Sequence, residues 1–180
     1  QEQEFFSQLV YTYSGIALGP DKTYLFENRL SEVAKAIGCP TLSDLYRRAK
    51  FNMTNDLRDR IVEAMTTNET LFFRDSAPFD ALRTKIIPDI IKRKGNTSKT
   101  LRIWSAACST GQESYSISML LHESFPDVVS NWSVEILGTD ISSQVIERAK
   151  KGRYSQIEVN RGLPITYLIK YFKQQGSEWV

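Results

Sequence analysis

The stretch "TLRIWSAACSTGQESYSISMLLHESF", residues 100–125, decides the fold class. It starts as an apolar run, passes through a turn of small residues and ends in a helical pattern. "WSVEILGTD" (132–140) then reads as a second strand, and "SSQVIERAKKG" (142–152) reads as a second helix. Strands that alternate with helices are typical of a parallel sheet with right-handed crossovers. We therefore predict an α/β domain over residues 100–180.

The small-residue turn inside this stretch is a candidate ligand site. The turn carries only small side chains at Ala106, Ala107, Ser109 and Gly111. A ligand could therefore approach the backbone closely and contact the amides of a helix N-terminus. Dinucleotide-binding loops carry G-x-G-x-x-G, whereas Gly111 stands alone here. The turn therefore disfavours a binding site for NAD or for a phosphate group. Taken alone, it is weak evidence for a nucleotide site.

Two carboxylates lie next to the expected strand ends. Ligands of doubly wound sheets bind beyond the carboxyl ends of the strands, and Asp140 ends the second strand. Its two oxygens could accept hydrogen bonds from both hydroxyls of a ribose, or Asp140 could simply cap the helix at Ser142. Glu113, at the start of the first helix, could contact a ligand or merely complement the helix dipole.

The first 66 residues read as helices. "DKTYLFENRLSEVAKAIG" (21–38) carries one apolar stripe and ends at Gly38 and Pro40; the stripe consists of Phe26, Leu30, Val33, Ala34 and Ile37. A second helix restarts at 41–50 with Thr41 or Ser43 as its cap. A third opens on Thr54 or Asn55 and places Leu57, Ile61 and Met65 on one face. We expect an N-terminal helical bundle over residues 1–66.

Residues 67–99 read as a loop and a linker between the two domains. "SAPFDALRTKIIPDIIKRKG" (76–95) predicts a capped helix that is broken or kinked near Pro88 and runs into the polar "KGNTSK" (94–99). After residue 153, only a short helix from about Pro164 to Phe172 is expected. Two strands alone would leave unpaired edges, so the chain looks truncated relative to a complete α/β domain.

Composition excludes several classes of function. The chain has 180 residues, of which 41% are hydrophobic and 24% charged, and it has neither a long apolar run nor a secretory leader. We therefore expect a cytoplasmic protein without membrane insertion. Cys39 and Cys108 lack metal-ligand spacing and are expected to be buried and reduced, and His122 is the single histidine. A net charge of +2 disfavours nucleic acid as a partner, and no metal is expected.

Four segments together resemble the CheR-type chemoreceptor glutamate methyltransferases. They are "TTNETLFFRD" (66–75), "RIWSAACSTGQESYSI" (102–117), "ILGTDIS" (136–142) and "ERAKKGRYS" (147–155). The resemblance covers nearly the whole chain. It implies a helical domain joined to a Rossmann-like, S-adenosylmethionine-dependent methyltransferase domain that is incomplete at the C-terminus. It also implies that a small β-subdomain begins near "ITYLIKYF" (165–172).

The resemblance also implies a set of site residues. Its cofactor contacts fall on five positions: Asn68, Thr70, Arg74, Glu113 and Asp140. Arg74 either orients groups beside the transferred methyl or only binds the cofactor. Phe72 and Phe73 are expected to anchor the loop by packing into the core rather than by contacting the cofactor.

The implied reaction methylates glutamate side chains in the cytoplasmic helical region of chemoreceptors and leaves S-adenosylhomocysteine. A glutamate with a pKa near ~4.3 is ionised at neutral pH, so no general base is needed. A non-catalytic CheR-like module that binds cofactor or receptor is the alternative. An enzyme acting on another substrate is disfavoured, because "TTNETLFFRD" is specific to this family.

The resemblance further implies that the helix at 21–38 grips the receptor, with Arg29 and Lys35 as candidate contacts. Glu32 departs from the basic pattern, and residues 1–66 carry eight Lys and Arg against nine Asp and Glu. A plain solvated helix face is therefore equally compatible with the sequence. The family's later segment, which closes the site, has no counterpart before Val180. A chain ending naturally at Val180 would be expected to bind cofactor weakly and to have little or no activity.

Overall fold

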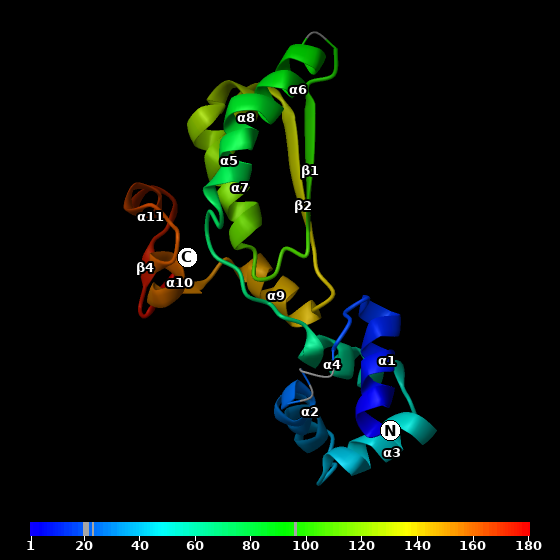
Figure 1. The fold of residues 1–180 in the computed structure, drawn as a ribbon. Coiled ribbons are helices and arrows are strands. Elements are labelled where there is room, and N and C mark those ends of the chain that lie inside the picture. Colours follow the sequence, from blue (N-terminus) through cyan, green and yellow to red (C-terminus); the bar gives the residue numbers. More distant parts are fainter. Residues whose placement is uncertain (20–21, 23, 96) are drawn as a thin grey trace. The chain divides into compact units, whose positions relative to one another are not determined.

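The computed structural model describes residues 1–19, 22, 24–95 and 97–180 (Figure 1). The chain forms two compact units, Gln1–Thr67 and Asn68–Val180. The described part of the first unit contains helices and no strand, whereas the second unit combines helices with a parallel sheet. This is the predicted fold class. Residues 68–99, which we predicted to link the domains, fall inside the second unit.

The first unit is built from α1 (Glu2–Ser14), α2 (Tyr24–Ala36), α3 (Leu42–Phe51) and α4 (Asn55–Met65). The predicted stripe on α2 faces the core, and only Ile37, just past the helix end, is half-buried. The core side chains come from all four helices and include Phe6, Val10, Phe26, Leu30, Leu45 and Ile61. Burial of these apolar stripes against one another is the main stabilising term of such a bundle.

Hydrogen bonds at the helix starts settle the two open cap assignments. The Thr41 hydroxyl accepts from the Asp44 backbone N–H at 3.1 Å, and the Asp44 carboxylate accepts from the Thr41 N–H at 3.1 Å, so α3 begins with a reciprocal capping box. The Thr54 hydroxyl likewise accepts from the Leu57 N–H at 3.2 Å at the start of α4. Ser43 lies inside α3.

Replacing the α3 cap should destabilise the first unit measurably. Thr41→Ala removes the acceptor for the Asp44 N–H and should lower the free energy of unfolding by about 1 kcal/mol. Ser43→Ala, the matched control, should change it by less than about 0.5 kcal/mol. Urea denaturation followed by circular dichroism measures both values, and equal effects of the two substitutions would contradict the cap assignment.

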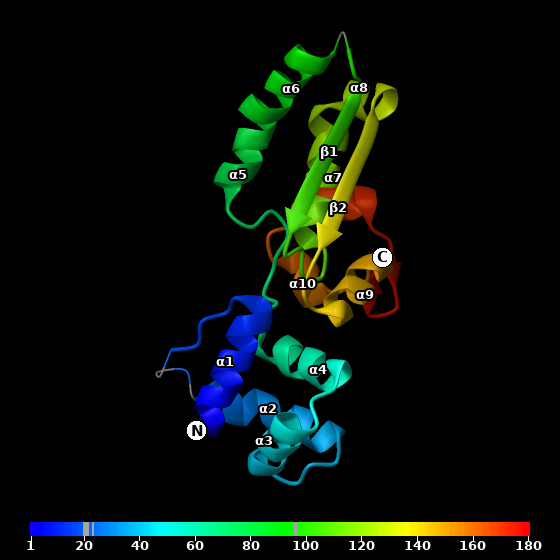
Figure 2. The ribbon, with the colours of Figure 1, turned by 90° about the vertical axis from the view of Figure 1, so that its right-hand side faces the viewer.

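The main sheet of the second unit pairs β1 (Thr100–Ala106) with β2 (Ser133–Thr139) in parallel. The register runs from Thr100 opposite Ser133 to Ala106 opposite Thr139, so both strands end at the same edge (Figure 2). The crossover consists of α7 (Gln112–Ser124), which was predicted, and the short α8 (Pro126–Asn131), which was not. Leu101, Ile117 and Leu121 are among the residues that form the core between the helices and this sheet.

The helix expected at 76–95 is interrupted, as we predicted from Pro88. It consists of α5 (Ser76–Ala81), a π-helical turn η2 (Leu82–Ile86) and α6 (Ile87–Lys94). Pro88 has no N–H and its ring clashes with the carbonyl of the preceding turn, so the regular ladder cannot continue through it. The predicted cap is wrong, because Asp75 at the N-cap has φ 58° and no side-chain hydrogen bond to the helix.

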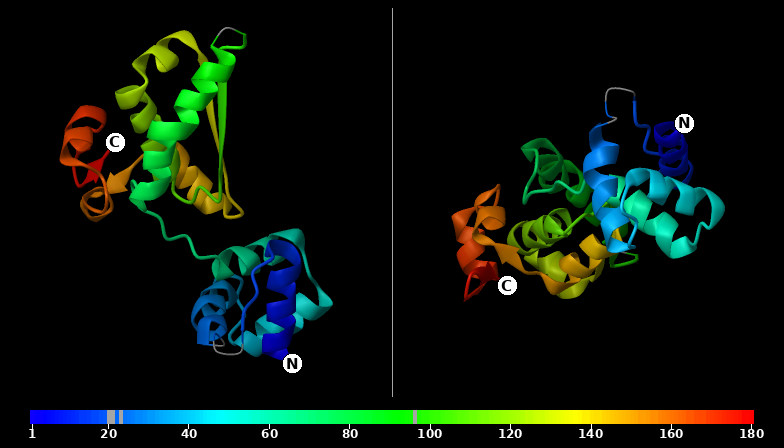
Figure 3. Two further views of the ribbon diagram at one scale, coloured as in Figure 1. Left: turned by 45° about the horizontal axis from the view of Figure 1, so that its top comes forward. Right: turned by 90° about the horizontal axis from the view of Figure 1, so that it is seen from below.

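The C-terminal part contains more structure than we predicted. After α9 (Ser143–Lys151) come β3 (Tyr154–Ser155), α10 (Gln156–Asn160), α11 (Ile165–Tyr171), β4 (Gln174–Gln175) and β5 (Glu178–Trp179). The last three strands form an antiparallel sheet in the order β3-β5-β4, and the helices α10 and α11 lie with them in one small lobe (Figure 3). The sequence pattern revealed only the first two strands of the chain, because two-residue strands show no alternating pattern in a sequence.

Among the described residues, every helix is too short or too polar to traverse a lipid bilayer.

Candidate functional site

The turn between β1 and α7, residues 107–111, has an unusual backbone. Ala107 has φ 60°, Ser109 has φ 50° and Gly111 has φ 95°. Non-glycine residues in this left-handed region carry a conformational cost of about 1–3 kcal/mol and cluster at functional sites. The Cys108 N–H donates to the Thr139 carbonyl at 2.9 Å, which ties the turn to the end of β2. The strained turn thus lies at the carboxyl ends of both strands.

Asp140 joins the two loops that follow the strands. Its Oδ2 accepts from the Ser109 N–H at 2.8 Å, and its Oδ1 accepts from the Ser142 N–H at 3.0 Å. Ser142, rather than Asp140, is the N-cap of α9, since its hydroxyl accepts from the Val145 N–H. A carboxylate has about four acceptor sites, so two remain for a ligand. Asp140 therefore organises the two loops without being the N-cap of α9, and it is half-buried with acceptor capacity left. Its contact with a ribose remains a prediction.

Ser109 connects this edge of the sheet to the NETLFFRD segment (residues 68–75). Its hydroxyl donates to the Asn68 carbonyl at 2.7 Å. Further along the segment, the Phe73 N–H donates to the Ser116 hydroxyl at 3.0 Å. The structure therefore brings Asn68 and Asp140 together through Ser109. From the sequence we considered Ser109 only as a small residue. Its hydroxyl, placed in a turn between a strand and a helix, could have indicated this connecting role.

Glu113 lies in the first turn of α7, and its Oε1 accepts from the Ser105 hydroxyl at 2.7 Å. Ser105 is buried near the end of β1, so it fixes the position of the exposed Glu113 carboxylate at the same edge as Asp140. From the sequence we assigned no role to Ser105. The site thus presents two carboxylates, one beside each strand end.

The two phenylalanines of the NETLFFRD segment pack into the protein, as predicted. Phe72 is fully buried and makes edge-on ring contacts with Tyr154 and Phe172, at centroid distances of 5.0 and 5.7 Å. Phe73 is half-buried against Phe79 and Tyr167, at 5.0 and 5.5 Å. These contacts anchor the segment between the helices and the C-terminal lobe.

Arg74 and Thr70 belong to the same segment. Arg74 is exposed, and its Nη1 donates to the Glu69 carbonyl at 3.2 Å. It stands between two residues with positive φ, Phe73 at 48° and Asp75 at 58°, so the backbone that carries it is strained on both sides. Thr70 is half-buried. The proposed roles of both residues remain predictions.

Packing within the protein requires a glycine at position 111, a reason that the sequence did not indicate. Gly111 is buried, and a Cβ there would lie 3.0 Å from the Ala149 side chain and 3.2 Å from both Tyr115 and Tyr154. Packing of the turn against α9 and β3, together with the positive φ, requires glycine at this position. Close approach of a ligand to Gly111 remains a prediction.

The electrostatics of the turn are those of a negatively charged site. Burial raises the pKa of the Cys108 thiol, and the carboxylates of Asp140 and Glu113 raise it further by disfavouring the thiolate. Cys108 and Cys39 are both free and buried, as expected. Two acids with spare acceptor capacity suit hydroxyl groups and a cationic ligand group.

Tyr154 holds the other side of the turn, because its buried hydroxyl donates to the Thr110 carbonyl at 2.8 Å. Burial raises its pKa well above the usual value of about 10. The protonated phenol therefore stabilises the fold fully below pH ~10, and this contribution is lost as the pH rises above that value.

Tyr154→Phe should flatten this pH dependence. The variant should lose about 1 kcal/mol at pH 7, because the Thr110 carbonyl loses its donor. Between pH ~9.5 and ~11 its free energy of unfolding should fall less steeply than that of the wild type. Urea titrations at a series of pH values measure this, and parallel curves for the two proteins would show that Tyr154 does not titrate in this way.

The two candidate receptor contacts on α2 already have partners within the first unit. Arg29 Nη1 donates to the Thr66 carbonyl at 2.8 Å, just past the end of α4, where a cation complements the helix dipole. Lys35 Nζ lies 3.0 Å from Glu32 Oε1 in an exposed pair. The pairing of Lys35 with Glu32 is consistent with a solvated face, and receptor binding by either residue remains a prediction.

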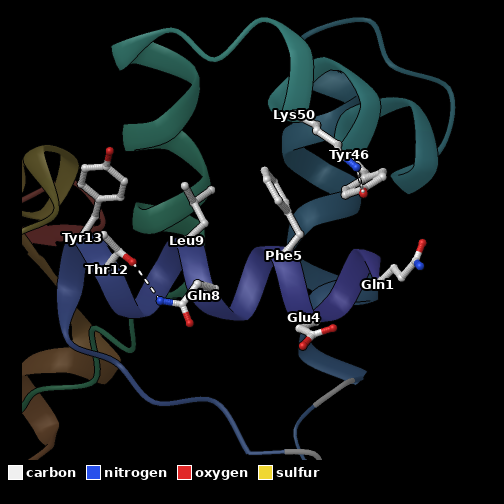
Figure 4. A pocket seen from close by; sticks show the side chains of 9 residues that line it. All are labelled: Gln1, Glu4, Phe5, Gln8, Leu9, Thr12, Tyr13, Tyr46 and Lys50. Atoms are coloured by element: carbon white, nitrogen blue, oxygen red, sulfur yellow. Dashed lines mark hydrogen bonds between the residues drawn. The ribbon is translucent and has the colours of Figure 1, made fainter.

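Two hollows in the described part of the chain are lined by residues other than the predicted cofactor contacts. One, of about 520 Å³, lies in the first unit beside α1 and α3, where Phe5, Leu9, Tyr13 and Tyr46 line it together with Lys50 (Figure 4). The other, of about 360 Å³, lies between α7, β2 and α9 and is lined by residues that include Cys108 and Ser114. None of the five predicted cofactor residues lines either hollow.

Comparison with known families matches both units. Residues 1–66 match the family model described as "CheR methyltransferase, all-alpha domain", and residues 68–180 match "CheR methyltransferase, SAM binding domain".

Named relatives agree with these matches. The chain is 40% identical over 164 residues to "Chemotaxis protein methyltransferase Cher2" of Pseudomonas putida, which covers 90% of this chain and 59% of the relative. It is 39% identical over 175 residues to "Chemotaxis protein methyltransferase 1" of Pseudomonas aeruginosa, a match that covers 96% of this chain and 63% of the relative. It is 36% identical over 168 residues to a chemotaxis protein methyltransferase of Borreliella burgdorferi, covering 93% and 59%. The chain thus spans about 60% of the length of these relatives.

Proposed function

The chain belongs to the CheR methyltransferase family, as its motifs predicted, and from this premise we propose that it methylates glutamate side chains of chemoreceptors. The proposed methyl donor is S-adenosylmethionine, and the product is a glutamate methyl ester. We place the reaction in the cytoplasm, on the helical region of the receptor. One observation carries the proposal: the NETLFFRD segment, the strained turn and Asp140 meet at the carboxyl ends of β1 and β2 through Ser109.

The polar groups at this edge of the sheet fit S-adenosylmethionine. Asp140 retains acceptor capacity after binding two backbone amides, which suits the two hydroxyls of a ribose. Glu113 supplies a second carboxylate for a cationic group, and the raised pKa of Cys108 supports a negative potential between the two. We assign Asn68, Thr70 and Arg74 to the remaining polar contacts. When bound, the cofactor supplies an activated methyl group.

The protein's own contribution is positioning. A receptor glutamate is ionised at neutral pH, so the site needs no residue to remove a proton. Arg74 can hold a carboxylate oxygen through its guanidinium, and the strained backbone on both sides of it restricts its direction. Such positioning lowers barriers by up to roughly 7–11 kcal/mol in favourable cases.

A transfer assay tests the proposal. The chain, and a version extended to the length of its relatives, are incubated with methyl-labelled S-adenosylmethionine and a chemoreceptor cytoplasmic fragment. Label that alkali releases from the receptor as methanol supports the proposed function. Cofactor binding without any transfer by the extended version would instead favour a non-catalytic signalling module.

Arg74→Ala separates orientation from cofactor binding. We expect turnover to fall about 100-fold, because the acceptor carboxylate loses its guanidinium partner. The dissociation constant for S-adenosylhomocysteine, measured by calorimetry, should rise less than about ten-fold. Unchanged turnover would reject the orienting role, and an equal loss in binding and turnover would make Arg74 a cofactor contact only. Arg83→Ala, which removes an exposed arginine paired with Asp80 on the following helical segment, is the control.

A further inference from the structure

Glu69 lies between two proposed cofactor residues, Asn68 and Thr70, but has no role in the proposed set. Its Oε1 accepts from Arg161 Nη2 at 3.0 Å, across 92 positions of the sequence. Its backbone carbonyl accepts from Arg74 Nη1 at 3.2 Å. One glutamate therefore stands between two guanidinium groups, one of which we have assigned to the substrate carboxylate.

Arg161 is held against the NETLFFRD segment by its neighbours. Gly162 has φ +87°, and a Cβ there would lie 2.0 Å from the Phe72 carbonyl oxygen, so the two backbones are in direct contact. The next residue, Leu163, is buried together with Phe72 in one apolar cluster. The turn that carries Arg161 is thus fixed on the segment, while the guanidinium itself stays about half exposed.

We infer that Arg161 binds the carboxylate of the substrate glutamate, and that Glu69 occupies Arg161 as an internal stand-in until the substrate arrives. The inference rests on the proposed function. Glu69 presents the same functional group as the substrate side chain, and a guanidinium has five N–H donors in a planar fork suited to carboxylates. Exposed ion pairs contribute little free energy, so an incoming carboxylate can displace Glu69 readily.

The test compares a chemoreceptor cytoplasmic fragment with glutamates at its methylation positions to the same fragment with glutamines there. Calorimetry with the full chain and saturating S-adenosylhomocysteine measures binding of each form. Arg161→Gln should weaken binding of the glutamate form about ten-fold and leave the glutamine form unchanged, so the preference falls by the same factor and Arg74 accounts for what remains. Glu69→Gln should strengthen binding of the glutamate form about two- to five-fold, because the internal competitor is gone.

Opposite effects of these two variants are the signature of competition. An ion pair that is only structural would make both variants weaker, and that result would overturn the inference. An undiminished glutamate preference in Arg161→Gln, or lack of any preference in the wild type, would also overturn it. Arg161→Lys should keep part of the preference, since it keeps the charge. Arg153→Gln breaks a comparable exposed pair with Glu178 and should change neither form.

These readouts are separate from methyl transfer. If the wild type prefers the glutamate form and the variants behave as expected while no methyl is transferred, the proposed function fails and the assignment of Arg161 stands. If methyl is transferred and Arg161→Gln leaves the preference intact, the assignment fails and the proposed function stands.

Discussion

Asp140→Ala should raise the dissociation constant for S-adenosylhomocysteine at least ~100-fold and abolish detectable methyl transfer. The carboxylate binds the backbone amides of Ser109 and Ser142, and we propose that it also accepts from the cofactor. Hydrogen bonds to a charged group are worth about 1.5–3 kcal/mol each, so loss of two proposed ligand contacts accounts for the predicted change. Loosening of the turn adds to it, because Ser109 also holds Asn68.

Isothermal titration calorimetry with S-adenosylhomocysteine measures this effect, and urea denaturation checks that the variant remains folded. Asp140→Asn should also bind weakly, because its amide group places a donor opposite one of the two backbone N–H groups. Glu135→Gln is the matched control: it removes an exposed carboxylate from β2, the strand that precedes Asp140, where Glu135 pairs with Arg102. A loss below about three-fold in Asp140→Ala would remove Asp140 from the cofactor site.

Gly162→Ala should destabilise the second unit by at least ~3 kcal/mol. The added Cβ would lie 2.0 Å from the carbonyl oxygen of Phe72. The Cβ is bonded directly to the backbone, and the oxygen is a backbone atom. Neither can rotate away, so the turn at 161–163 must separate from the NETLFFRD segment. The positive φ of Gly162 adds a further cost of about 1–2 kcal/mol for alanine. Burial of Phe72 should weaken as a result.

Gly176→Ala is the control that separates the steric clash with Phe72 from the cost of placing alanine at a positive φ. Gly176 also has a positive φ, of 64°, but its Cβ would meet no atom within 4 Å. We expect this variant to lose only about 1–2 kcal/mol. Urea denaturation followed by tryptophan fluorescence compares the two. Equal losses would show that the contact between Gly162 and Phe72 can relax without consequence.

Much of the fold could be predicted because its signals are local. The stripe on α2, the starts of α3 and α4 and the effect of Pro88 each depend on residues within a few positions of one another. The small sheet could not be predicted, since β3, β4 and β5 each have only two residues and pair across a long separation. Such strands carry no periodicity of their own.

The sequence by itself determined the family, the fold class with its two units, and the types of residue that the proposed site requires. The resemblance of its motifs to the family proposes Asn68, Thr70, Arg74, Glu113 and Asp140 as cofactor contacts, because the match depends only on the order of residues in the chain. Only the tertiary structure decided how these residues are held. Ser109 joins Asn68 to Asp140, Gly162 rests on Phe72, and Arg161 reaches Glu69, each across at least 31 positions. Contacts of this kind form when distant backbones pack together, and no local pattern encodes them.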